Sequence, residues 1–198
     1  MSRIQSVREN WTEITKRLRL DKQELANFLR FSAKMYKQGF PDAALIYQQN
    51  PYATKVAELE TWNKLGRLVN KGEHSIAVFG AEDKCRYLFD VTQTNGKRLP
   101  SMWSMTADLS ADVTAVINEK YGKGYKNIQE TIAAMSVDNL RSRMSEMMYA
   151  TGQMKLTDEK LKAYHQSVVS AVRFVVSSRC EINGGMKLAG NINLSSVC

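Results

Sequence analysis

Apolar residues recur three or four positions apart near the start of the chain, which is the period of a helix with one buried stripe. The positions with this spacing are Ile4, Val7, Trp11, Ile14 and Leu18. A second helix is predicted after them, because Asp21 with Glu24 forms a capping pair. Its inner face holds apolar residues from Leu25 to Tyr36.

The pattern changes between residues 58 and 94. The segment Glu58–Leu65 has helical character and ends at Gly66, where a left-handed glycine is the usual helix stop. Gly72 then provides a turn residue that tolerates positive φ. Three runs of strand character lie in this region, at residues 67–69, 75–79 and 85–91. We predict a small antiparallel β-meander with one polar face and helices on the other.

Alternation in the last of these runs predicts which side chains face inward. Tyr87, Phe89 and Val91 alternate on one face, whereas Arg86 and Asp90 lie on the other. We expect the first set to meet the helices and the second to face solvent. A short edge strand is also predicted to begin at Val56.

The rest of the chain is predominantly helical by its spacing. The fold class predicted is α+β, a meander of three or four strands packed against several helices. We expect a single domain over residues 1–181, with a basic helical part (1–40), the meander (58–94) and a second helical part (106–178). Residues 182–198 are rich in Gly and Asn, which indicates a tail or the start of a linker.

Composition limits the class of protein. At 198 residues with 43% hydrophobic content, the chain can bury a core without disulfides or a metal. No apolar run approaches the length of a membrane span, and the N-terminus lacks the pattern of a signal peptide. The three cysteines are odd in number and widely spaced, which favours a reducing, cytoplasmic location.

The formal net charge of +8 is unevenly distributed. Residues 1–40 hold nine Lys or Arg against four Asp or Glu, which gives +5, whereas residues 41–105 give +1 and residues 106–198 give +2. A basic chain with a pI near 9.4 is attracted to polyanions.

Cations near the predicted meander suggest a nucleic-acid site, because phosphates meet cations and bases stack on rings. The candidates on the sheet face and its rim are Trp62, Lys64, Arg67, Lys71, His74, Lys84 and Arg86. The loop that follows adds Lys97, Arg98 and Trp103. The alternative is an ordinary solvated face, with both tryptophans in the core.

The two N-terminal helices supply a second group of candidate phosphate contacts. It consists of Lys16, Arg17, Arg19, Arg30 and Lys34. Cations one or two turns apart on a helix can follow a strand of phosphates, and they are equally typical of a solvated helix face.

Several segments resemble a known family when they are taken together. They are residues 62–67 (WNKLGR), 71–78 (KGEHSIAV) and 89–94 (FDVTQT), with 45–54 (LIYQQNPYAT) and 117–122 (INEKYG). In this combination the chain resembles, over about residues 20–180, the N-terminal domain of ArdC-type antirestriction proteins. It is most similar to the version at the front of large helicase–methylase proteins of conjugative elements. The resemblance implies single-stranded DNA binding and protection of incoming plasmid, phage or other mobile DNA from host defences.

Residue patterns for catalysis are missing from the sequence. It contains no His-Glu-x-x-His, no Cys-x-x-Cys and no phosphate-binding Gly-x-x-x-x-Gly-Lys-Ser/Thr loop, so we predict a binding module without a cofactor or metal rather than an enzyme. A weak alternative is that Cys85 and His74 face each other as nucleophile and base.

The sequence is therefore compatible with three functions. The first is non-specific binding of single-stranded DNA or RNA in counter-defence. The second is direct inhibition of a host restriction or CRISPR effector nuclease of the Cas9 type, or of its guide RNA. The third is that the chain is the DNA-targeting module of a larger helicase or methylase.

Overall fold

The protein is described by a computed structural model that covers residues 2–99, 107–151 and 158–182. The chain divides into two compact units, residues 1–102 and 103–198, where the sequence predicts a single domain over residues 1–181. The described residues form seven α-helices, one 3-10 helix and five strands. The α+β class predicted from the sequence is therefore confirmed.

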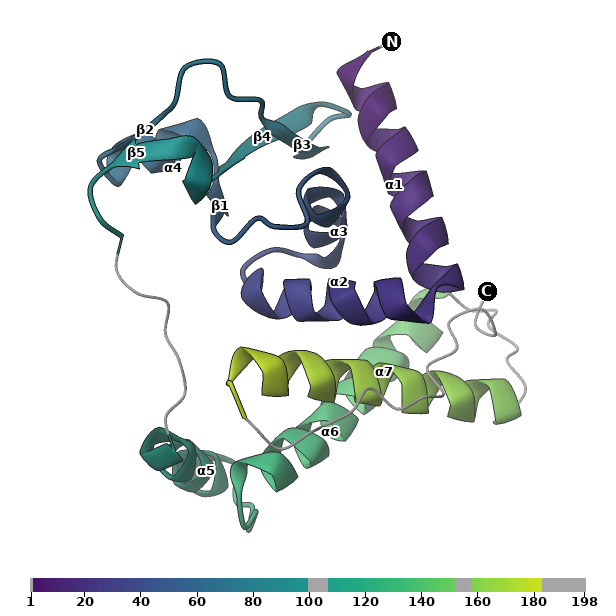
Figure 1. Ribbon diagram of the computed structural model, residues 1–198. Coiled ribbons are helices and arrows are strands. Elements are labelled where there is room, and N and C mark those ends of the chain that lie inside the picture. Colours follow the sequence, from purple (N-terminus) through teal and green to yellow (C-terminus); the bar gives the residue numbers. More distant parts are fainter. Residues whose placement is uncertain (1, 100–106, 152–157, 183–198) are drawn as a thin grey trace. The chain divides into compact units, whose positions relative to one another are not determined.

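The first unit contains four α-helices, the 3-10 helix and all five strands of the described residues (Figure 1). Its elements are α1 (Arg3–Leu20), α2 (Lys22–Lys34), α3 (Phe40–Gln49), β1 (Val56–Ala57), α4 (Leu59–Lys64), β2 (Arg67–Val69), β3 (Ile76–Phe79), β4 (Cys85–Asp90), the 3-10 helix η1 (Val91–Gln93) and β5 (Thr94–Gly96).

Helices α1, α2 and α3 pack together through their apolar stripes. The predicted cap of α2 is confirmed, since the Asp21 carboxylate accepts hydrogen bonds from the backbone N–H groups of Gln23 (2.8 Å) and Glu24 (3.0 Å). At the centre, Phe28 meets the rings of Phe40 and Tyr47 edge-on, with centroids 5.6 Å apart in both pairs. Such edge-to-face contacts add to the hydrophobic stabilisation of the core.

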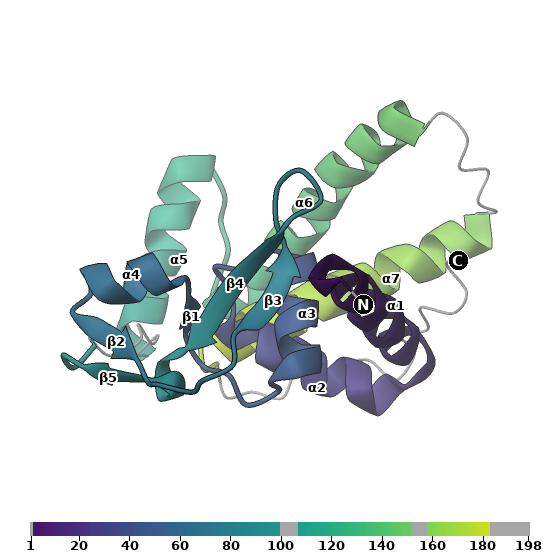
Figure 2. The same ribbon diagram turned by 90° about the horizontal axis from the view of Figure 1, so that it is seen from above.

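The strands form two small sheets rather than the predicted meander. The order of the three-stranded sheet is β1-β4-β3, and its neighbours are antiparallel (Figure 2). The predicted edge strand at Val56 is confirmed as β1. The expected pairing of residues 67–69 with 75–79 is wrong, because β2 pairs instead with β5, with Arg67 opposite Gly96.

Arg67 explains why β2 pairs with β5. Its guanidinium donates to the Thr94 hydroxyl (2.8 Å), the Thr94 carbonyl (2.7 Å) and the Lys97 carbonyl (2.6 Å). Gly96 has a φ of +126°, and a Cβ there would collide with the carbonyl of Gly66. The close approach of the two strands therefore requires glycine at this position.

The faces of β4 are the reverse of the sequence prediction. Leu88 and Asp90 are buried, whereas Tyr87 is 46% exposed and Phe89 is only partly buried. Arg86 shares the face of Leu88 and forms ion pairs with Asp42 of α3 and with Glu58. Arg86 and Asp90 can lie on this inner face because each has charged or backbone hydrogen-bonding partners there.

Asp90 is fully buried and joins three segments of the chain. One carboxylate oxygen accepts from the backbone N–H groups of Thr54 (2.7 Å) and Lys55 (3.0 Å). The other accepts from the backbone N–H (3.0 Å) and the hydroxyl (2.7 Å) of Thr92. In return, Gln93 accepts from the Asp90 N–H (2.9 Å), which completes a capping box for η1.

Gln49 closes the outer edge of β3. Its side-chain amide accepts from the Ala77 N–H (3.0 Å) and donates to the Ala77 carbonyl (2.8 Å). An open sheet edge can pair with other chains, and this amide pair satisfies the backbone groups of Ala77 from within the molecule.

The second unit contains α5 (Ala107–Tyr121), α6 (Ile128–Thr151) and α7 (Asp158–Arg179). Ile128, Ile132 and Leu140 of α6 are buried. The loop between α5 and α6 is held by Asn118, whose amide donates to the Tyr125 carbonyl (2.8 Å) and accepts from its N–H (2.9 Å). Within the described part of the chain, no helix has the length and apolar character needed to cross a bilayer.

Candidate nucleic-acid interface

Trp62 does not offer its ring to a base. It is 2% exposed, and its indole N–H donates to the Phe89 carbonyl at 2.9 Å. The alternative stated from the sequence, that Trp62 fills the core, is the one that the structure supports. Trp103 lies outside the described residues.

The two arginines predicted on the sheet face serve the fold instead. Arg67 is engaged with carbonyl and hydroxyl oxygens of residues 94–97, and Arg86 with Asp42 and Glu58. Because their guanidinium groups already have these partners, a phosphate would have to compete with internal bonds at both positions. The sheet therefore does not present Trp62, Arg67 and Arg86 as an exposed basic surface with a ring for stacking.

The remaining predicted cations of this region are exposed and lie on separate segments. Lys64 ends α4, whereas the others lie in loops before β3, between β3 and β4, and after β5. These loop residues are Lys71, His74, Lys84, Lys97 and Arg98. Lys84 pairs with Glu82 at 3.1 Å, and both side chains are highly exposed.

His74 and Cys85 do not form the nucleophile–base pair considered from the sequence. In the β3–β4 register Cys85 lies opposite Phe79 and Leu88 lies opposite Ile76. His74 precedes β3, so it lies beyond the opposite end of this ladder from Cys85. The two residues are separated by several strand positions, each about 3.3 Å long.

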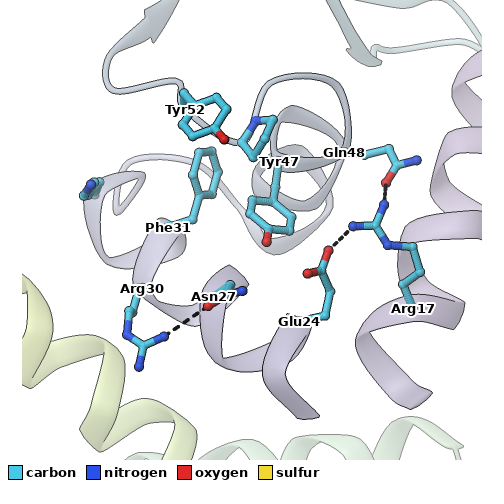
Figure 3. Close-up of a pocket in the computed structure, with 10 residues that line it drawn as sticks. Arg17, Glu24, Asn27, Arg30, Phe31, Tyr47, Gln48 and Tyr52 are labelled. Carbon is cyan, nitrogen blue, oxygen red and sulfur yellow. Dashed lines mark hydrogen bonds and ion pairs between the residues drawn. The ribbon is translucent and has the colours of Figure 1, made fainter. Parts of the chain in front are cut away.

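The helical cations, in contrast, come together. Arg17, Arg30 and Lys34 all line one cavity of about 530 Å³, built by α1, α2, α3 and the loop after α3 (Figure 3). The other lining residues are Glu24, Asn27, Phe31, Tyr47, Gln48, Pro51 and Tyr52. Lys16 and Arg19 are exposed on α1 and do not line the cavity.

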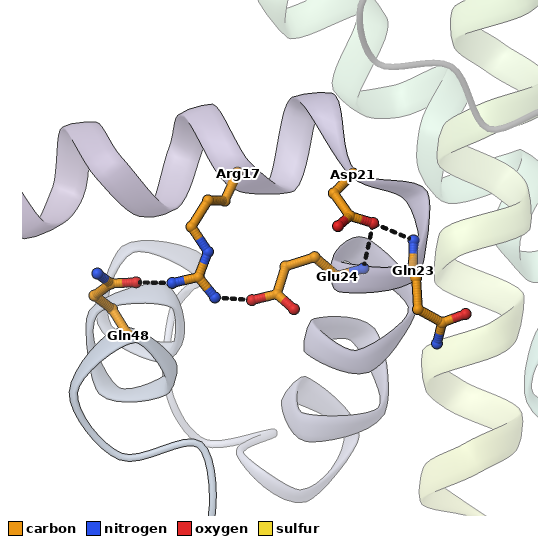
Figure 4. Close-up of polar contacts among 5 residues, drawn as sticks. All are labelled: Arg17, Asp21, Gln23, Glu24 and Gln48. Atoms are coloured by element: carbon orange, nitrogen blue, oxygen red, sulfur yellow. Dashed lines mark hydrogen bonds and ion pairs between the residues drawn. The ribbon is translucent and has the colours of Figure 1, made fainter.

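Arg17 fixes one end of this cavity. Its guanidinium forms an ion pair with Glu24 of α2 and donates to the Gln48 side chain of α3 at 2.8 Å (Figure 4). One side chain of α1 thus ties together all three helices. Since its charge is matched by Glu24, this end of the cavity is close to neutral.

The opposite end is basic. Arg30 is exposed and donates to the Asn27 side chain at 3.2 Å. Lys34, one turn further along α2, is also exposed and has no acidic partner among the described residues. The cavity therefore changes from neutral at Arg17 to positive at Lys34.

Aromatic side chains form another part of the lining. Phe31 and Tyr47 are buried, with ring centroids 5.2 Å apart, and Tyr52 is 87% exposed. Burial raises the pKa of the Tyr47 phenol above its usual value; the nearby Arg17 opposes this effect, whereas Asp21 adds to it. Like any tyrosine at neutral pH, Tyr47 carries its proton and can donate a hydrogen bond.

The sequence reasoning missed Tyr47 and Tyr52 as site residues. A signal for Tyr52 was present, because a large aromatic follows Asn50-Pro51 in a polar loop, where a core contact is not expected. Tyr47 gave no such signal, since it falls on the apolar face of α3. Among the described residues, no group of His, Cys, Asp and Glu is arranged to hold a metal ion.

Comparisons of this chain with protein-family models, with curated proteins and with solved structures find no match.

Proposed function

We propose that the protein binds single-stranded nucleic acid through the cavity of α1–α3, and that it does so in the counter-defence of a mobile genetic element. The observation that carries this proposal is the convergence of Arg17, Arg30 and Lys34 with Phe31, Tyr47 and Tyr52 on one cavity. Cations beside an exposed ring, here Arg30 and Lys34 with Tyr52, are the combination that unpaired strands require.

The distribution of charge along the chain also favours binding of nucleic acid at the N-terminal helices. The excess of +5 in residues 1–40 places most of the net charge of +8 on the segment that contains α1 and α2. A field of this sign attracts a polyanion towards the N-terminal helices before any specific contact forms. The counter-defence role comes from the resemblance to ArdC-type proteins, and the cavity supplies a site through which such a role would act.

Single-stranded and duplex oligonucleotides should bind with different affinities. An unpaired base can stack on Tyr52, whereas a base within a duplex cannot leave its own stack without a cost of a few kcal/mol. We expect fluorescence anisotropy to show tighter binding of labelled single strands than of the duplex. Two or three phosphate contacts should give a slope of log affinity against log salt of roughly −1.4 to −2.1.

Parallel titrations with DNA and RNA strands of the same sequence would define the preferred polymer. An affinity that does not change with salt concentration, or that is higher for the duplex, would overturn the proposal. No binding at low salt would leave direct contact with a host nuclease as the function to examine.

A further inference from the structure

We infer that the cavity of α1–α3 holds a single nucleotide, with its phosphate at the Arg30–Lys34 end and its base against Tyr52. This inference rests on the proposed function and specifies the ligand unit that its site receives.

The size fits one nucleotide rather than a length of strand. At about 530 Å³, the cavity lies within the range of roughly 300–1,000 Å³ that is typical of small-ligand pockets. A longer stretch of strand needs an extended groove with several cations along it, so the cavity receives one nucleotide of a bound strand and the neighbouring nucleotides lie outside it. Here the lining cations are confined to α1 and α2 around one hollow.

The lining groups are ordered in the way a nucleotide requires. In Figure 3 the rings of Phe31, Tyr47 and Tyr52 lie along one side, and Asn27 and Arg30 lie along the other. A nucleotide likewise has a flat apolar face, a polar edge and an anionic group at one end. The side-chain oxygens of Asn27 and Gln48 already accept from Arg30 and Arg17, so these two amides can serve the edge as donors through their NH₂ groups.

Charge sets the direction in which the nucleotide lies. The ion pair between Arg17 and Glu24 leaves that end of the cavity close to neutral, so it offers a phosphate no net positive charge. At the other end Lys34 has no acidic partner among the described residues. The phosphate is therefore placed near Lys34 and Arg30, and the uncharged sugar or base edge near Glu24, which can accept from an amino or hydroxyl group.

Tyr52 is the side chain best placed to hold the base. Among the side chains whose burial the structure describes, it is the most exposed large hydrophobic one, at 87%, and it lies in the lining of the cavity rather than on an isolated surface. The Tyr52 ring can cover a base that has entered the cavity. This contact would bury apolar surface on both the ring and the base. Stacking of this type tolerates any base, so the pocket imposes little sequence preference.

The test combines competition with substitution of Tyr52. Adenosine and thymidine monophosphates, and inorganic phosphate as a separate probe, are titrated against a labelled single strand bound to the full chain. We expect the nucleotides to displace the strand, and phosphate to do so only at much higher concentration. Tyr52→Ala should weaken both nucleotide and strand binding by about tenfold, and Tyr52→Phe should retain the wild-type affinities.

A matched control is Tyr87→Ala, which removes a half-exposed tyrosine from β4 and should leave both affinities unchanged. If the strand binds but nucleotides fail to compete and Tyr52→Ala has no effect, the nucleotide pocket is wrong while the proposed function stands. If nucleotides bind and strands do not, the pocket is supported and the proposed function is wrong. Phosphate competing as well as the nucleotides would also overturn the pocket, because the base would then contribute nothing.

Discussion

Asp90→Ala should lower the free energy of unfolding of the first unit by about 4 kcal/mol. The substitution removes the acceptor of three backbone N–H groups and one hydroxyl, and each buried donor left without a partner costs about 1–3 kcal/mol. The loop at Thr54 and Lys55 and the turn at Thr92 would lose their common anchor. Urea unfolding followed by circular dichroism measures the change.

Two companion variants make the Asp90 result specific. Asp90→Asn keeps the shape of the side chain but turns an NH₂ group towards the N–H donors that Asp90 accepts from. We therefore expect a loss of unfolding free energy between that of Asp90→Ala and zero. Glu13→Ala, which removes one exposed carboxylate from α1, should change the stability by no more than about 0.5 kcal/mol. A loss below about 1 kcal/mol for Asp90→Ala would contradict the anchoring role.

Reversing the charges at Arg30 and Lys34 together should weaken binding of single strands by roughly tenfold or more. The pair Arg30→Glu and Lys34→Glu removes two phosphate contacts and adds two repulsive charges at the basic end of the cavity. Because both cations face the one phosphate held in the cavity, the slope of log affinity against log salt should become shallower by about 0.7. Anisotropy titrations over a range of salt concentrations give both quantities.

The matched control for this pair is Lys64→Glu with Lys71→Glu. It makes the same change in net charge on exposed side chains of α4 and of the loop before β3. We expect a small, uniform loss of affinity from the altered field and a salt slope close to that of the wild type. An equal loss from both double variants would mean that net charge, and not the cavity, determines binding.

Local sequence signals predicted much of the fold. The spacing of Val7, Ile14 and Leu18 located α1 and its buried face. Asp21 located the start of α2, and Gly66, with a φ of +72°, located the end of α4. These features depend on residues near one another in the chain, which is why the pattern reveals them.

Strand pairing and the faces of β4 were not predictable in this way. β2 pairs with β5 because Arg67 reaches residues 94–97 and because Gly96 permits close approach. Asp90 is buried because its donors come from residues 54–55 and 92. Such partners lie up to 36 positions away in the chain, so alternation alone assigned the polar residues of β4 to solvent.

The candidate site was partly predictable for a related reason. Charge is visible in the sequence, so Arg17, Arg30 and Lys34 were identified as candidates, whereas their convergence depends on how α1, α2 and α3 pack. Burial is not visible in the same way, and Trp62 was therefore considered as a stacking ring although it fills the core. Tyr52, the ring that is exposed, lies in a loop whose path the pattern does not define.

The segments for which the sequence predicts a resemblance to ArdC-type proteins have different roles in this chain. The Asp90 side chain accepts from the backbone of residues 54–55 just before β1, Gln93 caps η1, and the Thr94 hydroxyl accepts from Arg67 of β2. The segment 45–54 is different, because it contributes Tyr47, Gln48, Pro51 and Tyr52 to the cavity. Of these segments, residues 89–94 therefore stabilise the fold, and residues 45–54 coincide with the proposed site.

Photochemical cross-linking is the most direct test of whether the strand enters the cavity of α1–α3. A single strand containing iododeoxyuridine is irradiated with the full chain, the complex is digested with trypsin, and the modified peptide is identified by mass spectrometry. We expect the label on the peptide of residues 38–55, which contains Tyr47 and Tyr52, and we expect Tyr52→Ala to remove most of it. Labels confined to residues 64–98 would place the strand on the sheet and contradict the account.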